Sequence, residues 1–160
     1  MTFINKDISI LIDNVIKKFP LDRKKSAIIE SLLILQHHNS GYITKDMMRE
    51  LADYLSVSEI EIYEVATFYT MINTKPVGKN VIAVCNNVSC MLRGSDQILS
   101  HIEKKLNIKV GQSTMDNKFY LKDEVECLAA CNGAPMMQIN HKNYENISIE
   151  QVDKIIENLK

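Results

Sequence analysis

The chain has 160 residues, which is enough for one ordinary domain or two small ones. Hydrophobic residues make up 46% of it and charged residues 24%, and the formal net charge is -1, a balance typical of globular proteins. Because there is no basic excess to neutralise phosphates, nucleic acid is not expected as a partner. Because no apolar run approaches the roughly 20 residues that span a bilayer, direct membrane insertion is not expected either.

The first residues do not have the pattern of a targeting sequence. Asp7 and Asp13 interrupt the apolar residues, as a secretory signal would not, and residues 1–18 lack the Arg of a transit peptide. We therefore expect a protein of the bacterial cytoplasm. In a reducing cytosol, four cysteines in two closely spaced pairs indicate metal ligands or redox groups more strongly than they indicate structural disulfides.

Residues 1–75 are predicted to form a small helical bundle, because apolar residues recur at helical spacing in four segments separated by short polar turns. In the last of these segments Ser58 and Glu61 form a capping box, in which each side chain satisfies a free backbone N–H. The expected helices run from an N-cap at Asp7 to Phe19, from Ala27 to about His37, from Thr44 to Leu55, and from Ser58 to Tyr69.

Residues 76–160 follow a break at residues 74–78 and show the pattern of a small α/β sheet. A capping box of Ser148 and Gln151 marks the start of the last helix. The expected fold class is therefore α+β, with a helical bundle over residues 1–75 and an α/β domain over residues 76–160. The predicted elements are strands at 81–85, 119–121, 136–139 and 142–145, a loop through Gly94, and helices at 95–106 and from 148 onward.

The four cysteines form the pattern Cys85-x4-Cys90 and Cys127-x3-Cys131. Four thiolates are what a [2Fe–2S] cluster takes, and a C-x4-C pair also occurs in plant-type ferredoxins. Such a cluster needs each pair on a loop that can fold back on itself. The turn-forming and small residues near both pairs suit such loops, and their backbone N–H groups can donate to sulfur and tune the potential.

Other interpretations of these cysteines remain open at this point. Isolated cysteines in a cytosolic protein are most often apolar fillers, but the pairing and loop placement argue against this. A structural zinc site uses similar spacings, so the spacing alone favours neither an iron–sulfur cluster nor a zinc ion. A thioredoxin-type dithiol is disfavoured, because no C-x-x-C is present.

Around these residues the sequence resembles the family of NADH-quinone oxidoreductase E subunits, the thioredoxin-like [2Fe–2S] subunits of respiratory complex I. The resemblance extends over roughly residues 20–160. It is carried by the segments Glu64–Met71, Lys75–Gly78, Val84–Gly94, Glu124–Cys127 with Cys131, Ala134–Met136 and Tyr144–Asn146.

The resemblance implies a helical bundle followed by a thioredoxin-like domain, with a [2Fe–2S] cluster on Cys85, Cys90, Cys127 and Cys131. It further implies a flavoprotein partner that binds NADH and FMN and exchanges one electron with the cluster, and a neighbouring iron–sulfur subunit. The assembly would be the peripheral arm at the cytoplasmic face of the inner membrane. One-electron transfer needs no general acid, base or nucleophile, so no catalytic side chain is expected.

Two rival functions stay open. One is the equivalent diaphorase subunit of an NAD-linked hydrogenase or formate dehydrogenase. The other, from a different class, is a zinc-stabilised adaptor. The sequence also departs from the family pattern at Ala129, Gly133 and His141. Ala129 stands where glycine is usual, which matters if that position requires a positive φ.

Two further groups have a structural and a functional interpretation. We expect Arg93, the cation nearest the first pair, to be a surface or interface residue and not a tuning group. The helical face around Val65, Phe68, Tyr69 and Met71 is expected to be core, with docking on the flavoprotein subunit as the alternative.

Overall fold

The computed structural model describes residues 2–123 and 125–159, so Met1, Lys160 and Glu124 of the second ligand motif lie outside it. The chain divides into two compact units after Pro76, where the sequence pattern placed the division after Lys75. Each unit is considered by itself.

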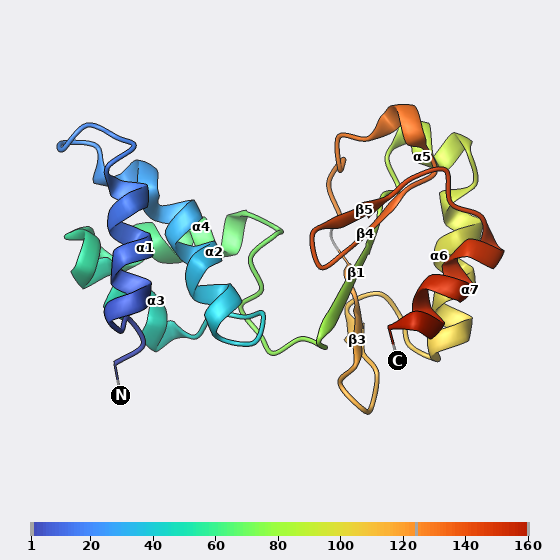
Figure 1. The fold of residues 1–160 in the computed structure, drawn as a ribbon, viewed down its shortest axis with the longest axis horizontal. Coiled ribbons are helices and arrows are strands. Elements are labelled where there is room, and N and C mark those ends of the chain that lie inside the picture. The colour runs from blue at the N-terminus through green and yellow to red at the C-terminus, as the bar shows by residue number, and fades with distance from the viewer. Residues whose placement is uncertain (1, 124, 160) are drawn as a thin grey trace. The chain divides into compact units, whose positions relative to one another are not determined.

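The first unit is built from helices, shown in blue to green in Figure 1. Its core consists of buried aliphatic side chains contributed by every one of these helices, such as Ile12, Leu32, Leu51 and Ile62. The predicted helical bundle is therefore confirmed. The helices are α1 (Lys6–Ile16), α2 (Ile28–His38) preceded by a 3-10 turn (Lys24–Ala27), α3 (Lys45–Leu55) and α4 (Glu59–Phe68).

The helix starts follow the capping residues of the sequence, with one correction. The Thr44 hydroxyl accepts from the Met47 N–H, and the Glu61 carboxylate accepts from the Ser58 N–H, as predicted. The predicted N-cap at Asp7 is wrong. The cap is Asn5, whose side-chain oxygen accepts from the N–H groups of Asp7 and Ile8. Asp7 instead lies in the first turn, where its negative charge favours the helix N-terminus.

The end of α4 also differs from the expectation. Ile62 and Ala66 take the buried face of this helix. Phe68 lies two positions beyond Ala66, which is about 200° around a helix, and its side chain is 76% exposed. Met71 is 44% exposed, so the expectation of core is wrong for these two residues, whereas Val65 and Tyr69 do pack against the core.

The second unit is a five-stranded sheet with the strand order β2-β3-β1-β4-β5. The central strand β1 pairs with β3 in parallel and with β4 antiparallel, in a register that places Val84 opposite Met137. This confirms the α+β class, although the short β2 was not predicted. The strands are β1 (Asn80–Val84), β2 (Gln112–Ser113), β3 (Phe119–Leu121), β4 (Met137–Ile139) and β5 (Lys142–Tyr144).

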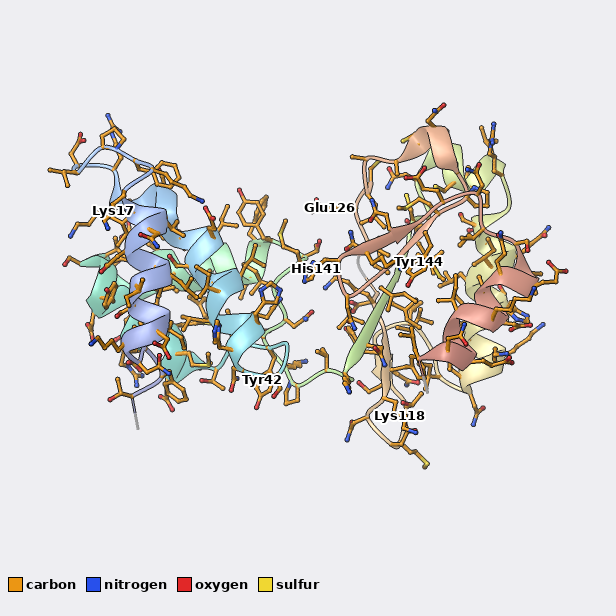
Figure 2. The ribbon with its side chains drawn as sticks, viewed as in Figure 1. Lys17, Tyr42, Lys118, Glu126, His141 and Tyr144 are labelled. Carbon is orange, nitrogen blue, oxygen red and sulfur yellow. The ribbon has the colours of Figure 1, made fainter. Side chains whose placement is uncertain are left out.

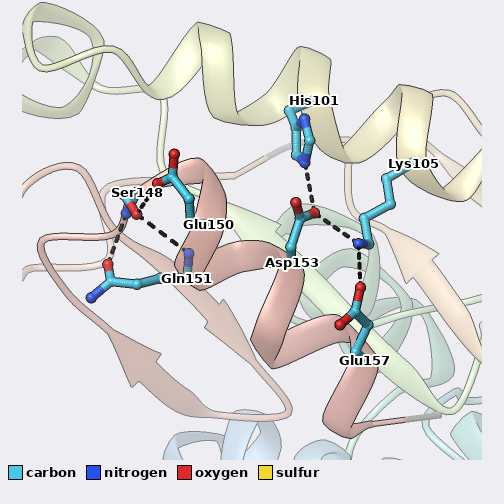
Figure 3. Close-up of polar contacts among 7 residues, drawn as sticks. All are labelled: His101, Lys105, Ser148, Glu150, Gln151, Asp153 and Glu157. Carbon is cyan, nitrogen blue, oxygen red and sulfur yellow. Dashed lines mark hydrogen bonds and ion pairs between the residues drawn. The ribbon is translucent and has the colours of Figure 1, made fainter.

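Two helices, α6 (Ser95–Leu106) and α7 (Ile149–Asn158), lie side by side along one face of this sheet (Figure 1). Their apolar side chains, including Ile102 and Ile156, form the core with strand residues such as Ile82 and Leu121. The capping box at the start of α7 is confirmed, because Ser148 N–H donates to Gln151 and the Gln151 N–H donates back to the Ser148 hydroxyl (Figure 3). Within the described residues no helix is both long and apolar enough to cross a membrane.

Candidate functional site

The first cysteine pair is carried by the central strand and a short helix. Cys85 follows β1, the most buried strand of the sheet, and its backbone N–H donates to Met136 O at 3.2 Å. The predicted loop after it is wrong in part. A short helix, α5 (Val88–Leu92), forms there, and it turns Cys90 inward. The two side chains are only 2% and 1% exposed, so the fold itself fixes the first pair.

The second pair lies on a longer segment between β3 and β4, which Glu126 marks in Figure 2. Residues 125–130 of this segment have no regular structure, and a 3-10 turn, η2 (Cys131–Gly133), follows. Cys127 and Cys131 are both exposed. The end of the segment is held by the last hairpin, because Asn146 N–H donates to Gly133 O at 2.6 Å.

The structure explains what two departures from the family pattern, Ala129 and Gly133, require of the backbone. Ala129 has a φ of 56°, so the position does require the left-handed conformation that glycine adopts without penalty. At Gly133 a Cβ would lie 2.6 Å from the Glu145 Cβ, closer than any real contact. Glycine is therefore needed at position 133, whereas alanine at position 129 carries a conformational cost.

The four cysteines lie close together in the second unit. Cys127 Sγ and Cys131 Sγ lie 3.6 Å apart. The Cys90 and Cys127 thiols both lie near enough to the Cys85 thiol to lower its pKa, so Cys85 is a neighbour of both pairs. Two thiolates on one tetrahedral metal with bonds of about 2.3 Å would be about 3.8 Å apart, so the second pair has the spacing of two ligands to one ion.

The arrangement in pairs bears on which metal centre fits. Within residues 2–123 and 125–159, no three His, Cys, Asp or Glu side chains are arranged around one ion. A bridged di-iron rhomb takes four cysteine ligands, two for each iron. A structural zinc ion instead gathers all four ligands around itself. Two thiols from each of two segments match the number of ligands that the di-iron group takes.

The environments of the thiols differ. Burial raises the pKa of Cys85, but N–H groups of Asn87 and Leu128 donate to its sulfur and the net shift is downward. Burial is also the main reason that the pKa of Cys90 is raised, although the Met136 N–H donates to its sulfur. The neighbouring Cys127 thiol raises the pKa of Cys131. Thus backbone donors from the second segment reach both sulfurs of the first pair.

Leu128 and Met136 were not singled out as functional residues by the sequence analysis, because their contribution comes from backbone N–H groups that carry no sequence signal. Arg93 is exposed, as expected for a surface residue. Its guanidinium also donates to Ala134 O at 3.2 Å, so it connects the two cysteine-bearing segments.

Exposed apolar side chains also lie on α5. Val88, Met91 and Leu92 are exposed, and Leu92 is 76% exposed. These residues were also missed, although their spacing of three and four positions on one side of a helix could have indicated a common face.

Comparisons with known proteins identify the family. The profile of the family described as thioredoxin-like [2Fe–2S] ferredoxin matches residues 12–160. The chain is 44% identical to the E subunit of the NADH-quinone oxidoreductase of Rickettsia bellii over 159 residues, which cover 99% of this chain and 94% of the relative. It is 39% identical over 149 residues to the mitochondrial NADH dehydrogenase [ubiquinone] flavoprotein 2 of Dictyostelium discoideum, covering 93% of this chain and 60% of that protein.

Among solved structures, the air-oxidised NAD+-reducing [NiFe]-hydrogenase is similar in fold. The TM-score is 0.67 at 22% sequence identity, over 80% of this chain and 22% of that longer chain. At this level of identity the similarity concerns the fold.

Proposed function

Since this chain belongs to the thioredoxin-like [2Fe–2S] ferredoxin family and carries its cluster, we propose that Cys85, Cys90, Cys127 and Cys131 are the four ligands. The observation that supports this most strongly is the meeting of four thiols from two segments, with the second pair 3.6 Å apart. Each segment supplies two thiolates, which matches the needs of a two-iron group.

The proposed role is that of an electron-carrying subunit in the NADH-oxidising module of a respiratory NADH:quinone oxidoreductase. Relatives at 44% identity over almost the whole chain bear that enzyme's name. The chain would be part of an oxidoreductase without catalysing a bond change itself. It would exchange one electron with the FMN of a neighbouring flavoprotein subunit and also contact a neighbouring iron–sulfur subunit, in the peripheral arm at the cytoplasmic face of the bacterial inner membrane.

The residues of the site support this role in distinct ways. When bound, the cluster supplies a one-electron couple. The thiolates would hold it, and the Leu128 and Met136 N–H groups would stabilise negative charge on the sulfurs. The buried first pair would shield one side from water, whereas exposed Cys127 and Cys131 leave the other side open to a partner.

The alternative assemblies have weaker support. An equivalent subunit of an NAD-linked hydrogenase rests on a structural similarity at 22% identity, which concerns the fold. The 44% identity to a protein named for NADH-quinone oxidoreductase favours the respiratory enzyme.

Metal analysis of protein purified without oxygen tests the ligand proposal. We expect about two irons and two sulfides per chain, a brown colour, and a one-electron EPR signal after reduction. A colourless protein with about one zinc would instead support the zinc-stabilised adaptor.

A second experiment tests the exchange with flavin. The cluster-loaded chain is mixed anaerobically with the flavoprotein subunit and NADH, and the visible bands of the cluster are followed by stopped flow. We expect bleaching that depends on both NADH and the flavoprotein. Cluster that stays oxidised in a stable complex of the two subunits would argue against the exchange.

A further inference from the structure

We propose that Cys127 and Cys131 form a reversible disulfide in the cluster-free chain when the thiol pool becomes oxidising, and that this bond prevents the chain from loading its cluster. The second cysteine-bearing segment would thus be a thiol-oxidation site as well as a ligand loop. The consequence for loading rests on the proposed function, because it assumes that both residues are ligands.

The distance between the two sulfurs is the first argument. Cys127 Sγ and Cys131 Sγ are 3.6 Å apart, and a disulfide bond is about 2.04 Å long, so the atoms need to approach by about 1.6 Å. Residues 125–130 have no regular secondary structure to break. The left-handed conformation of Ala129 already curls the chain back between the two cysteines.

The difference in exposure is the second argument. Cys127 and Cys131 are exposed, whereas Cys85 and Cys90 are buried. An oxidant that is as large as a tripeptide disulfide can reach the exposed pair only. Cys85 also contacts the Cys127 thiol, so a Cys85–Cys127 bond is the main competitor, and burial of Cys85 disfavours it.

The rest of the fold does not depend on these two residues. The two large cores consist of aliphatic and aromatic side chains and contain no cysteine. Cys85 and Cys90 pack in a separate small cluster with Ala134 and Met136, which does not include the exposed pair. The chain can therefore keep its fold while the second segment changes its covalent state.

The reaction balances with a low-molecular-weight disulfide such as glutathione disulfide as the oxidant. The thiolate of one exposed cysteine attacks a sulfur of the oxidant, whose S–S bond breaks and releases one glutathione thiolate. The second cysteine then attacks the mixed disulfide, forms the Cys127–Cys131 bond and releases the second glutathione. Two protein thiols lose two electrons and two protons, and two glutathione molecules are produced.

The sequence provides a direct way to locate the bond. Cleavage after Lys and Arg places Cys85 and Cys90 on one peptide, residues 80–93, and Cys127 and Cys131 on another, residues 123–142. The full chain is freed of iron under reducing conditions, its helix content is checked by circular dichroism, and it is incubated with glutathione disulfide. Free thiols are then alkylated in denaturant before cleavage and mass spectrometry.

We expect the 123–142 peptide to be unalkylated and lighter by two hydrogens, and the 80–93 peptide to carry two alkyl groups. A bond within residues 80–93, a bond joining the two peptides, or glutathione that stays attached would each overturn the proposal. As a matched control, Cys127→Ser should keep one glutathione on Cys131 and form no bond within the peptide.

Cluster loading is measured on the same samples with ferrous iron and sulfide. The reduced chain should develop the cluster bands, the oxidised chain should not, and dithiothreitol should restore loading to the reduced level. If the oxidised chain loads equally well, the inference fails while the proposed ligands stand. If the reduced chain loads no cluster but the bond still forms, the proposed function fails instead.

Discussion

The two cysteine-bearing segments of the second unit position their thiols in different ways. The first segment follows the central strand β1, buries both sulfurs and turns through the short helix α5. The second is mostly irregular and exposes both sulfurs, and its end is held to the β4–β5 hairpin by the Asn146 N–H bond to Gly133 O. One pair is positioned by the core, and the other by a few hydrogen bonds. The difference teaches that one metal site can combine ligands buried by the core with ligands exposed on an irregular segment.

The largest expected effect comes from removing one ligand in each segment. Cys127→Ser should abolish or grossly alter the cluster, and Cys90→Ser should do the same. The variants should differ in stability. Cys127 is exposed, so its replacement should change the free energy of unfolding of the cluster-free chain by less than about 0.5 kcal/mol, whereas replacement of buried Cys90 should lower it by about 1 kcal/mol or more.

Visible absorption and iron content measure the first effect, and denaturant unfolding of the iron-free chains measures the second. Equal losses of stability in the two variants would show that the second pair is as firmly held by the fold as the first. Retention of a normal cluster in either variant would remove that residue from the ligand set.

The next effect concerns the held end of the second segment. Gly133→Ala would place a Cβ 2.6 Å from the Glu145 Cβ, and it would disturb the Asn146 N–H bond to Gly133 O. We expect a loss of about 1–3 kcal/mol in the free energy of unfolding, as for other overpacked positions. Denaturant unfolding measures it. A change below about 0.5 kcal/mol, the size typical of surface substitutions, would show that the hairpin yields to the added methyl group.

The same contrast explains what the sequence could and could not reveal. Helix starts such as those after Thr44 and Ser148 and the short β-rich run around Ile82 are local signals, and these were predicted correctly. The convergence of the cysteines followed from their spacing and the family resemblance. The donation from Leu128 N–H to Cys85 was not predictable, because it comes from backbone groups brought together across the fold. The exposure of Phe68 was missed although its position, about 200° around the helix from Ala66, was readable from the spacing.

A smaller effect of opposite sign is expected at Ala129. Its φ of 56° costs a non-glycine residue about 1–2 kcal/mol, and glycine would relieve this at an entropic cost of about 0.5–1 kcal/mol. Ala129→Gly should therefore raise the free energy of unfolding by up to about 1 kcal/mol. The neighbouring Ala130 has a φ of -117°, so Ala130→Gly is a matched control that should lower stability. Destabilisation by both substitutions would mean that the left-handed turn carries no strain.

The helices that follow the two segments are joined at Asp153 (Figure 3). Its carboxylate lies 2.8 Å from Lys105 Nζ and 2.7 Å from His101 Nε2, and these groups hold the pKa of Asp153 below its ordinary value. The folded state therefore binds this proton less tightly than the unfolded state. The resulting stabilisation is present above the unfolded pKa of about 3.9 and is lost as the pH falls through the lower folded value.

Asp153→Asn should accordingly lower the melting temperature at pH 7 and have progressively less effect as the pH is lowered toward 3. Thermal unfolding across this range measures the difference from the unchanged chain. Glu157→Gln is the matched control, because it leaves both contacts of Asp153 in place. A difference between Asp153→Asn and the unchanged chain that stays constant with pH would exclude the ion pairs as its source.

The smallest effect on stability and cluster assembly is expected at Arg93, which connects the first cysteine-bearing segment to the second. Arg93 is exposed, and its guanidinium donates a single hydrogen bond to Ala134 O at 3.2 Å. The segments are also joined by the Cys85 N–H bond to Met136 O and by the Leu128 N–H donation to the Cys85 sulfur. Because these remain, Arg93→Ala should leave cluster assembly intact and cost about 0.5 kcal/mol or less in unfolding free energy. Full optical bands after anaerobic reconstitution would support this, with Arg93→Lys as the charge-retaining control. Loss of the bands in Arg93→Ala alone would mean that the second cysteine-bearing segment depends on the hydrogen bond from Arg93. The other bonds to the first segment would then be insufficient to position it.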